Sequence, residues 1–449
     1  MNTNQTKVFI KTFGCQMNKL DSELSIGSLV KSGYVLVDDE GDADVILLNT
    51  CSVRDKAEHK VYSQLGSLRE QKEKNPELIL GVLGCMAQND GDKIFKRMPH
   101  VNLVCGTRMF SKLPELIEGI NGSNKRILAI DEDGEVSFDR LVTQRQNRHN
   151  AFVSIMRGCD NYCSYCIVPY VRGSEFSRPV TDIIDEVKSL ADDGCKEVTL
   201  LGQNVNSYGK GLDGKVTLAT LLRELDPIEG IERIRFVTSH PKDMTKEILE
   251  AVGKLPRVCE YLHMPAQSGS DRILKKMRRQ YTSAHYRELV EMDKSLAPDI
   301  KIASDFIVGF PGETEEDFED TVNLMKDVRY QNCFIFKYSP RTGTAATEFP
   351  DDVGEETKKR RNHILLDLQK KISTEENRKM VGKSVEVLVE GRSKYDAGRL
   401  SGRTRQNQIV AFDLPGDKSQ KDVTTSLSGK LVKIDIVDST DLTLLGVIN

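Results

Sequence analysis

The sequence contains no apolar run long enough to cross a membrane, and its first residues lack the apolar segment of a signal peptide. Its 449 residues include no stretch of eighteen apolar residues, which argues against a membrane-spanning helix. The first residues, MNTNQTK, are polar, so no secretory signal peptide is expected. We therefore expect a cytoplasmic protein with no membrane association. In that reducing environment the ten cysteines favour metal or redox chemistry over disulfides.

The chain also lacks a strong net charge, which is only −4 and by itself excludes no class of partner. A hydrophobic share of 38% and a charged share of 29% are ordinary for a globular protein, and the length predicts two to four domains. The charge is uneven: residues 358–405 hold fourteen lysines and arginines against six acidic residues, a balance of +8. A basic C-terminal portion on an otherwise acidic chain predicts a polyanionic partner such as RNA.

Three cysteines within eight residues are the strongest chemical signal. Cys159, Cys163 and Cys166 stand in the run RGCDNYCSYC. Three thiolates at this spacing can cap one face of a cubic iron–sulfur cluster, because each binds a different iron, and the fourth iron stays open to a small molecule. The alternative is zinc, but zinc takes four ligands and no cysteine or histidine follows within twenty residues of Cys166.

This spacing resembles the signature of the radical S-adenosylmethionine (SAM) enzymes. In that family the open iron binds SAM, and one electron from the cluster cleaves SAM to a 5′-deoxyadenosyl radical. Tyr165, just before the third cysteine, also fits the family pattern. The resemblance implies a [4Fe–4S] cluster and SAM as cofactors, with Tyr165 beside the SAM.

Residues 1–122 alternate between β-branched apolar runs and amphipathic helical patterns. Strands are expected at residues 7–13, 44–50 and 78–84, and helices at 20–31 and 54–74. This alternation predicts a doubly wound α/β domain with a parallel sheet.

Three further cysteines, Cys15, Cys51 and Cys85, each follow directly on one of these strands. Because the carboxyl ends of parallel strands line one crevice, the three thiols are expected at one edge of the sheet. The alternative is three buried core cysteines. The repeated position favours a second three-cysteine cluster site. Cys105 also lies near a strand end, and geometry alone does not exclude it as a ligand.

Residues 123–150 are weakly patterned and are predicted to be a connector. The βα alternation then resumes through residues 151–375. Strands are expected at 151–155, 197–201, 231–238, 259–264, 301–308 and 333–338, and helices at 181–192 and 314–328. Six units are too few for an eight-fold barrel and suit the partial barrel of the radical SAM enzymes. The clustered cysteines follow the first of these strands, at the end where barrel enzymes place their chemistry.

Polar residues follow later strands of this segment and are candidates for holding SAM. They are Gln203, Asn204, Ser239 and Gln267. Loops at strand ends present amides and hydroxyls where a nucleoside can dock. Ordinary turn formation is the alternative for each of them.

Residues 379–449 show short strands without a helical pattern. Strands are expected at 384–389, 399–403, 408–412, 431–437 and 442–448. Five short strands predict a small all-β barrel of the oligonucleotide-binding type. Basic residues of this segment form a candidate RNA-binding patch: Arg392, Lys394, Arg399, Arg403 and Arg405. A solvated charged face is an equally good interpretation.

Over nearly its whole length the chain resembles the methylthiotransferase family. The N-terminal segment resembles that family's iron–sulfur domain through TFGCQMN, NTCSVR and GCMAQ around Cys15, Cys51 and Cys85. The middle resembles its radical SAM core, and the end resembles its TRAM RNA-binding module. Cys105 matches no ligand position. The motifs around Cys15 and Cys51 are most similar to those of the bacterial tRNA branch.

The resemblance implies methylthiolation at C2 of N6-isopentenyladenosine 37 in the tRNA anticodon loop. It implies two [4Fe–4S] clusters, on Cys159, Cys163 and Cys166 and on Cys15, Cys51 and Cys85, through which the six cysteines are catalytic. Two SAM molecules are used, one as methyl donor and one as radical source. An aromatic C–H bond with no acidic proton requires such cofactor chemistry. The implied partners are tRNA, an electron donor such as flavodoxin or ferredoxin, and a sulfur donor. The chain itself is expected to be a monomer.

Other functions stay open at this point. The same chemistry acts on a ribosomal-protein aspartate or on threonylcarbamoyladenosine in other branches of the family. A non-catalytic iron–sulfur RNA-binding redox sensor is the alternative from a different class.

Overall fold

The computed structural model describes residues 5–52, 55–120, 125–130, 145, 148–394, 396, 398–413 and 426–449. The chain divides into two compact units. Unit 1 comprises residues 1–146 together with 157–160 and 166–175, and unit 2 comprises residues 147–156, 161–165 and 176–449. Among the described residues, no helix is both long and apolar enough to cross a membrane.

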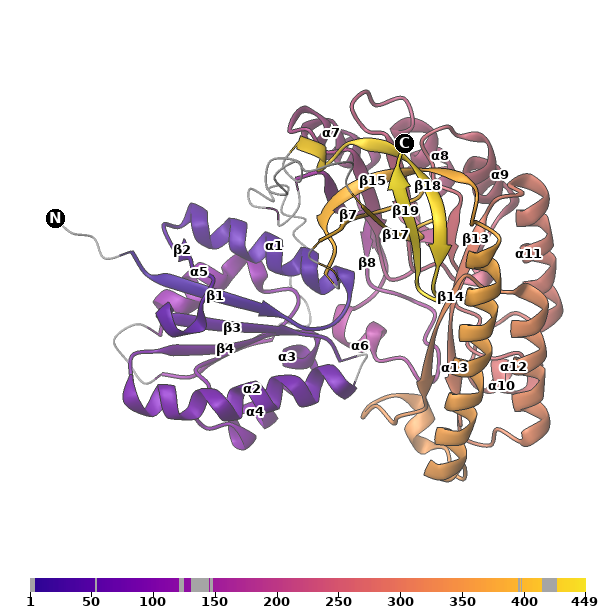
Figure 1. Ribbon diagram of the computed structural model, residues 1–449. Helices are drawn as coiled ribbons and strands as arrows, with labels where there is room; N and C mark the ends of the chain where they lie inside the picture. Colours follow the sequence, from indigo (N-terminus) through magenta and orange to yellow (C-terminus); the bar gives the residue numbers. More distant parts are fainter. Residues whose placement is uncertain are drawn as a thin grey trace. The chain divides into compact units, whose positions relative to one another are not determined.

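Unit 1 is built on a six-stranded, all-parallel sheet with the order β2-β1-β3-β4-β5-β6 (Figure 1). The strands are β1 (Lys7–Thr12), β2 (Val35–Leu36), β3 (Val45–Thr50), β4 (Ile79–Gly84), β5 (Leu103–Cys105) and β6 (Ile127–Ala129). Three of them match expected strands, and β5 is the strand expected near Cys105. Two were not expected: β2, which is only two exposed residues, and β6, which lies inside the expected connector.

Helices cover both faces of this sheet. They are α1 (Gln16–Lys31), α2 (Asp55–Lys74), α3 (Cys85–Asp90), α4 (Asp92–Arg97), α5 (Leu113–Glu118) and α6 (Val168–Arg172), with short 3-10 turns η1 (Glu40–Asp42) and η2 (Phe110–Lys112). Alternate residues of β3 enter different cores: Ile46 and Leu48 pack with α2, α3 and α4, whereas Val45 and Leu47 pack with α1 and α5. Burial on both faces explains the unbroken apolar runs and confirms the doubly wound fold.

The central part of unit 2 is a half barrel of six parallel strands. They are β7 (Asn150–Ser154), β10 (Glu197–Leu201), β11 (Arg233–Phe236), β12 (Tyr261–His263), β13 (Lys301–Val308) and β14 (Asn332–Lys337). Two three-stranded sheets, β11-β10-β7 and β12-β13-β14, meet through a bridge between Ile234 and Val258. The expected partial barrel is confirmed. The short strands β8 (Met156–Arg157) and β9 (Phe176–Ser177) flank the loop that carries the three clustered cysteines.

Helices line the outer face of the half barrel. They are α7 (Val180–Asp192), α8 (Leu218–Leu225), α9 (Lys246–Lys254), α10 (Asp271–Lys276), α11 (Ser283–Leu296), α12 (Glu315–Val328) and α13 (Glu355–Arg378). Short 3-10 turns occur at η3 (Val205–Ser207), η4 (Pro241–Asp243) and η5 (Ala345–Glu348). One apolar layer joins strand residues such as Val198 and Phe306 to helix residues such as Val187 and Leu222. Threonine caps explain several helix starts: Thr314 and Asp317 form a reciprocal capping box on α12.

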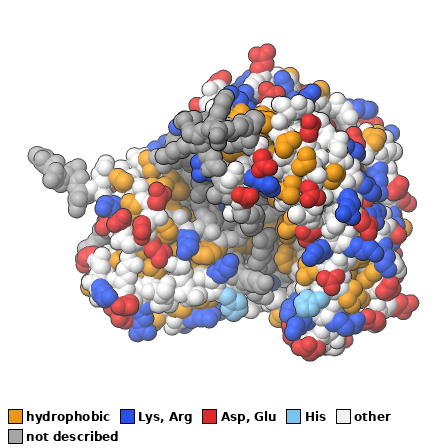
Figure 2. All heavy atoms as spheres, viewed as in Figure 1, with side chains coloured by type: hydrophobic (Ala, Val, Ile, Leu, Met, Phe, Trp, Pro, Cys, Tyr) orange, Lys and Arg blue, Asp and Glu red, His pale blue; other side chains and the backbone are white. Residues whose placement is uncertain are grey.

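The C-terminal part of unit 2 is a closed five-stranded barrel with the order β15-β16-β17-β19-β18. Its strands are β15 (Ser384–Arg392), β16 (Leu400–Arg403), β17 (Ile409–Asp413), β18 (Leu431–Ser439) and β19 (Thr443–Ile448). Val387, Val410, Phe412 and Ile434 fill its core. All five expected strands are present. Figure 2 shows orange apolar side chains over this barrel, where Val437 is exposed.

Candidate active site

Cys15, Cys51 and Cys85 lie at the carboxyl ends of three neighbouring strands of unit 1. Cys15 follows β1 and caps α1, Cys51 follows β3 directly, and Cys85 begins α3 after β4. Because β1, β3 and β4 are adjacent and parallel, their ends meet at one edge. The expected helix at 20–31 begins earlier, at Gln16, because Cys15 has extended backbone and serves as its cap.

Two glycines allow the backbone to approach closely at this edge. Gly14 has φ +122°, and a Cβ there would lie 2.4 Å from Cys51 Cβ. Gly84 has φ +93°, and a Cβ there would lie 2.6 Å from the carbonyl oxygen of Thr50. Only glycine fits both the backbone angle and the space, so these residues bring the thiols together.

Electrostatics at this edge favour a thiolate. A hydrogen bond involving the Cys51 thiol lowers the pKa of Cys15 to about 6, and the Arg172 guanidinium acts in the same direction against burial. Burial raises the pKa of Cys85, and Arg172 opposes that shift. Arg172, on α6, is held by a buried ion pair of 2.7 Å with Asp21. A buried cation that acts on Cys15 and Cys85 suits thiolate ligands.

A buried amide network supports Cys15 from below. The Cys15 thiol donates to Asn18 Oδ1 at 3.0 Å, and Asn18 Nδ2 donates to Asn49 Oδ1 at 3.2 Å. Asn49 Nδ2 in turn donates to Ser22 Oγ at 2.9 Å.

Cys105 differs from the three thiols, because it packs in the apolar core and burial raises its pKa to about 12. The structure therefore places Cys105 among core residues.

The residues present fit an iron–sulfur group. Among the described residues, the Thr50 and Ser52 hydroxyls, on either side of Cys51 in the chain, are buried without a hydrogen-bond partner, so two donors are available to an additional acceptor. In the described part of the chain no three histidine, cysteine or acidic side chains are arranged to hold a single metal ion. A cubic cluster does not require such an arrangement, because each thiolate binds its own iron.

The loop with the other three cysteines is divided between the two units, since Cys159 and Cys166 belong to unit 1 and Cys163 to unit 2. In unit 1, the Cys159 N–H donates to the Gly173 carbonyl at 3.1 Å. In unit 2, the buried Arg279 donates through Nη1 to Cys163 Sγ at 3.5 Å and through Nη2 to the Pro265 carbonyl at 2.8 Å. Arg279 is only 4% exposed, so its charge serves this loop and not the surface.

The predicted SAM-holding residues of unit 2 lie at the carboxyl ends of its strands. Asn204 Nδ2 donates to Asp243 Oδ2 at 2.7 Å, and Gln267 has left-handed backbone at φ +67°. Gln203 is half-buried, and Tyr165 packs against the small core around Phe310. Their contact with SAM stays a prediction.

Unsatisfied polar atoms gather at the same strand ends. Among the described residues, the buried atoms without a hydrogen-bond partner include Asn161 Nδ2, Asn204 Oδ1, Asn206 Oδ1, Ser239 Oγ and His240 Nε2. Burial lowers the pKa of His240 to about 2, with Arg279 and Lys242 acting in the same direction, so this ring is neutral. Buried orphans of this number are costly without a polar ligand, and they fit SAM. No motif in the sequence marks Asn161 or Asn206 as site residues.

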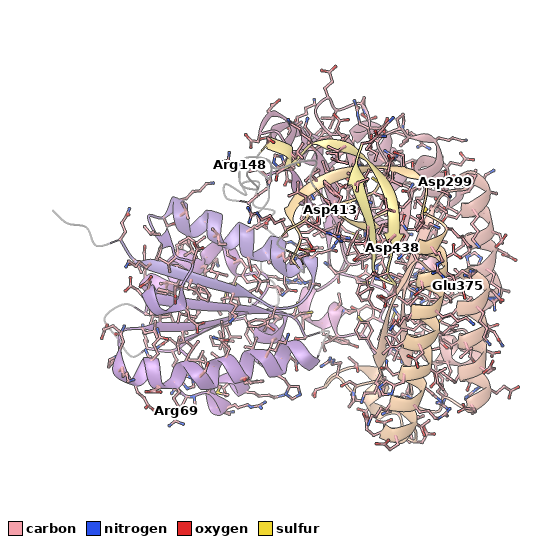
Figure 3. The ribbon with its side chains drawn as sticks, viewed as in Figure 1. Arg69, Arg148, Asp299, Glu375, Asp413 and Asp438 are labelled. Atoms are coloured by element: carbon pink, nitrogen blue, oxygen red, sulfur yellow. The ribbon has the colours of Figure 1, made fainter. Side chains whose placement is uncertain are left out.

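The five basic residues predicted to bind RNA differ in their surroundings. Arg392 and Lys394 are exposed. Arg399 Nε pairs with Asp413 at 2.8 Å, and Asp413 is labelled in Figure 3. Arg403 pairs with a glutamate, and Arg405 makes a pair of 2.7 Å with Glu260 that is three-quarters buried. Their RNA contacts stay a prediction, and Arg392 and Lys394 are the most accessible.

Two buried arginines attach the C-terminal barrel to the half barrel within unit 2. Arg233 Nη1 donates to the Arg403 carbonyl at 2.7 Å. Arg235 Nη2 donates to the Thr404 carbonyl at 2.7 Å and pairs with Glu197 at 3.0 Å. Both arginines are at most 4% exposed. The turn after β16 is therefore fixed against the amino-terminal part of the half barrel.

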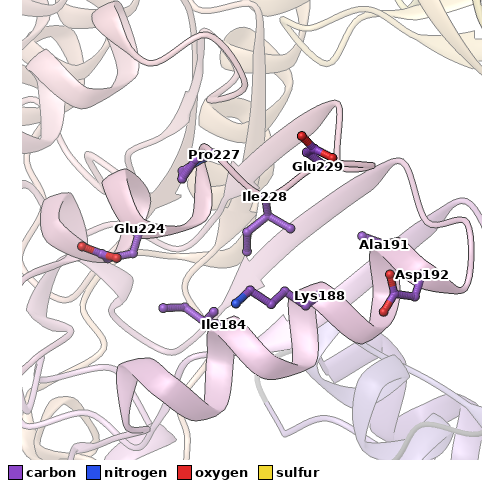
Figure 4. A pocket seen from close by; sticks show the side chains of 8 residues that line it. All are labelled: Ile184, Lys188, Ala191, Asp192, Glu224, Pro227, Ile228 and Glu229. Carbon is purple, nitrogen blue, oxygen red and sulfur yellow. The ribbon is translucent and has the colours of Figure 1, made fainter.

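A separate hollow of about 510 Å³ lies on the helical side of the half barrel (Figure 4). Ile184 and Lys188 of α7 face Ile228 across it. Glu224 and Glu229 also line it, away from the strand ends that carry the site residues. Its mixed lining identifies no ligand.

Three family models match successive parts of the chain. The uncharacterized protein family UPF0004 matches residues 7–106, the radical SAM superfamily residues 153–325 and the TRAM domain residues 378–448. A curated relative from Clostridium botulinum (strain Loch Maree / Type A3), a tRNA-2-methylthio-N(6)-dimethylallyladenosine synthase, is 47% identical over 98% of this chain and 96% of its own. The chain belongs to this synthase family. A relative of the same name from Thermoanaerobacter pseudethanolicus is 47% identical over 97% of this chain and 91% of its own.

Solved structures resemble the synthase family member in fold. A radical SAM methyltransferase, TsrM from Kitasatospora setae, aligns with a TM-score of 0.55 at 13% identity, over 74% of this chain and 73% of its own. The cobalamin-dependent radical enzyme OxsB aligns with a TM-score of 0.51 at 14% identity, over 80% and 56%. At these identities the likeness concerns the fold alone. As a radical SAM enzyme of this family, the chain uses SAM and a [4Fe–4S] cluster.

Proposed function

We propose that this chain inserts a methylthio group at C2 of N6-isopentenyladenosine 37 in the anticodon loop of tRNA. The observation that carries the proposal is the combination of a synthase-family sequence over 98% of the chain with three thiols gathered at one sheet edge beside Arg172. A transfer that replaces an aromatic C–H bond needs radical chemistry, which SAM and a [4Fe–4S] cluster supply when bound, and it also needs a sulfur donor.

The residues divide into two proposed cluster sites. Cys15, Cys51 and Cys85 would hold one cluster, and Cys159, Cys163 and Cys166 would hold the other. Arg172 balances the negative charge that three thiolates bring to the first site, and Asp21 holds Arg172 in place. Arg279 plays the corresponding part at Cys163, where its planar guanidinium is fixed by Pro265.

The SAM molecule is proposed to bind at the strand ends of the half barrel, near Tyr165, Gln203, Asn204, Ser239 and Gln267. The unpaired amide oxygen of Asn204 can accept a hydrogen bond from SAM, and the unpaired hydroxyl of Ser239 can accept or donate one. His240 accepts a hydrogen bond from the Lys242 N–H at 3.2 Å and so orients the turn after β11. Because the ring is neutral, His240 brings no positive charge to the site.

The remaining proposals concern organisation and partners. We propose an N-terminal domain of residues 1–122, a connector of 123–150, a radical SAM core of 151–375 and an RNA-binding domain of 379–449. The proposed partners are the tRNA anticodon stem-loop, an electron donor such as flavodoxin or ferredoxin and a sulfur donor. The proposed state is a cytoplasmic monomer.

Product analysis tests the reaction. Protein reconstituted with iron and sulfide is incubated with SAM, a reductant and tRNA that carries N6-isopentenyladenosine, and the nucleosides are analysed by mass spectrometry. We expect the 2-methylthio nucleoside. Protein with full cluster content that forms no such product, but modifies a ribosomal-protein aspartate instead, would overturn the proposal.

Iron counting tests the two cluster sites. Two [4Fe–4S] clusters bind about eight irons per chain. A triple Cys15→Ala, Cys51→Ala and Cys85→Ala variant is expected to keep about half. The matched control is Cys105→Ala, which removes a core thiol and leaves the iron content unchanged. Loss of iron in the control, or retention of all iron in the triple variant, contradicts the assignment.

A further inference from the structure

The inner face of the half barrel carries two exposed phenylalanines on one strand. Cys333 and Ile335 of β14 pack in the apolar layer beneath the helices. Since strand side chains alternate, Phe334 and Phe336 point to the opposite, concave face. They are 44% and 37% exposed, and Phe176 is the only other described phenylalanine exposed to this extent. Exposure of two neighbouring rings forgoes hydrophobic burial, which indicates a ligand for this face.

Strand register places a carboxylate beside these rings. Phe334 is the direct partner of Asp305 on β13, and Phe336 is the partner of Ile307, so all four side chains share the concave face. His263 of β12 donates through Nε2 to Asp305 Oδ1 at 3.1 Å. Its ring meets Phe334 edge-on at 6.3 Å. Asp305 keeps its second oxygen for a ligand and is 24% exposed.

The group lies toward the carboxyl end of the half barrel. Ile307 and Phe336 each stand one residue before the end of their strand. The Gln267 N–H donates to the Asp305 carbonyl at 2.8 Å, which links the proposed SAM-side loop directly to this strand. At the opposite end, Arg233 and Arg235 hold the C-terminal barrel in place. A ligand on this face therefore lies where barrel enzymes carry out their reactions.

We propose that Phe334, Phe336 and Asp305 form the surface that recognises the target base and its N6 substituent. This proposal rests on the proposed function. Phe334 contacts the flat face of the unstacked adenine, Phe336 and Ile307 contact the apolar isopentenyl group, and Asp305 accepts the single hydrogen left on N6. His263 is a positioning residue that acts through Asp305. An aromatic ring, an apolar wall and one acceptor match the three chemical features of this nucleobase.

Equilibrium binding of short anticodon stem-loops to the reconstituted holoenzyme, followed by fluorescence anisotropy without reductant, tests the proposal. Two RNAs are compared, one with adenosine 37 and one with N6-isopentenyladenosine 37. The wild type is expected to prefer the modified RNA. Phe336→Ala is expected to lower that preference about tenfold, because it removes an apolar contact made only by the isopentenyl group. Phe334→Ala is expected to weaken the binding of both RNAs about tenfold, and Phe334→Tyr is expected to keep wild-type affinity because it retains the aromatic ring.

A third RNA carries unsubstituted purine at position 37, which has no N6 amine, and tests the role of the Asp305 carboxylate. Asp305→Ala is expected to weaken the binding of the two adenosine RNAs and to leave the binding of the purine RNA unchanged. The matched control is Leu366→Ala on α13, an apolar side chain with the same 44% exposure as Phe334. Iron content should stay at the wild-type level in every variant, and SAM cleavage in the absence of RNA should stay at that level in Leu366→Ala.

Failure of the reaction and failure of the recognition surface give different results. A wild type that forms no 2-methylthio product under reducing conditions overturns the proposed function itself. A wild type that forms product, with Phe334→Ala and Phe336→Ala variants that bind all RNAs as Leu366→Ala does, overturns the recognition surface alone.

Discussion

At the scale of single residues, the most unusual group outside the site is a buried carboxylate. Asp293 on α11 is fully buried, and neither of its carboxylate oxygens has a hydrogen-bond partner among the described residues. Burial raises its pKa from 3.8 to about 8, against a weak opposing effect of Lys294. The folded protein therefore keeps Asp293 protonated at a pH where the unfolded chain ionises it.

This predicts a pH-dependent stability with a definite sign. The contribution of Asp293 is most favourable below its unfolded pKa of 3.8 and is lost as pH rises toward the folded pKa of about 8. Asp293→Asn should flatten that decline, with a gain on the order of 2 kcal/mol near pH 7.5. Urea unfolding at about pH 5 and about pH 7.5 measures it. An equal change in the free energy of unfolding between the two pH values in wild type and variant would refute the prediction. The control is Asp299→Asn, at an exposed aspartate.

A second prediction at this scale concerns Gly14. Alanine there must adopt φ +122° and place its Cβ 2.4 Å from Cys51 Cβ, so β1 and β3 have to move apart. We expect Gly14→Ala to lower iron content by about half, through the site of Cys15, Cys51 and Cys85. Gly33→Ala is the control for a left-handed glycine, because its φ is +89° and no atom lies within 4 Å of the added Cβ. Equal iron loss in both variants would show general misfolding.

At the scale of elements, two buried arginines join β11 to the turn after β16 in unit 2. Arg235→Met removes the donors to the Thr404 and Arg405 carbonyls and leaves Glu197 buried without its partner. Breaking such a buried pair should cost about 3 kcal/mol. Adding Glu197→Leu should recover part of it, because the orphaned charge is then gone. Thermal unfolding of both variants measures the difference, and no recovery would point to lost packing instead.

The helix α13 shows how the same unit covers its open edge. β14 is the last strand of the half barrel, and Asn362 Nδ2 of α13 donates to the Ile335 carbonyl at 3.1 Å. Gln369 Nε2 donates to the Tyr330 carbonyl at 2.9 Å. The exposed side of α13 carries charged side chains such as Glu375, which pairs with Arg329. The helix thus protects an edge strand while leaving the concave face of β14 accessible.

At the scale of the whole molecule, charge is the long-range property that bears on function. The basic region 358–405 is partly neutralised by internal pairs such as Arg405–Glu260 and Arg361–Glu313. The net excess of +8 in the sequence therefore overstates the positive charge available to a polyanion. What stays exposed includes Arg392 and Lys394.

This predicts a modest salt dependence of tRNA binding. The double variant Arg392→Ala and Lys394→Ala should reduce the slope of log Kd against log salt by about 1.5, since each phosphate contact releases about one counterion. Binding titrations over a salt series measure the slope. Lys188→Ala with Lys254→Ala, on helices of the outer layer, is the matched control. An unchanged slope in the first variant would exclude these two residues from the RNA interface.

Much of this architecture was predictable because its signals are local. Apolar runs of strand length and helical periods predicted the parallel sheet, the half barrel and the five-stranded barrel, and β10 and β13 have the expected bounds. The six cysteines could be nominated as ligands because their spacing, or their place after strands, is visible along the chain, and their ligand role stays a prediction. Two-residue strands such as β2 carry no such pattern, and β6 gains its pairing only from β5.

Short-range pattern and motifs were enough to predict the parallel sheet, the half barrel, the small barrel and the family, and to nominate the six thiols. Which charged side chains lie beside those thiols depends on contacts between distant parts of the chain. The tertiary structure buried Arg172 and Arg279 beside thiols, paired Arg405 with Glu260 and turned Phe334 toward an open face. Partners far apart in sequence meet only after the strands align. The role of a charged or aromatic residue depends on those partners and on burial, and neither is written in its neighbours along the chain.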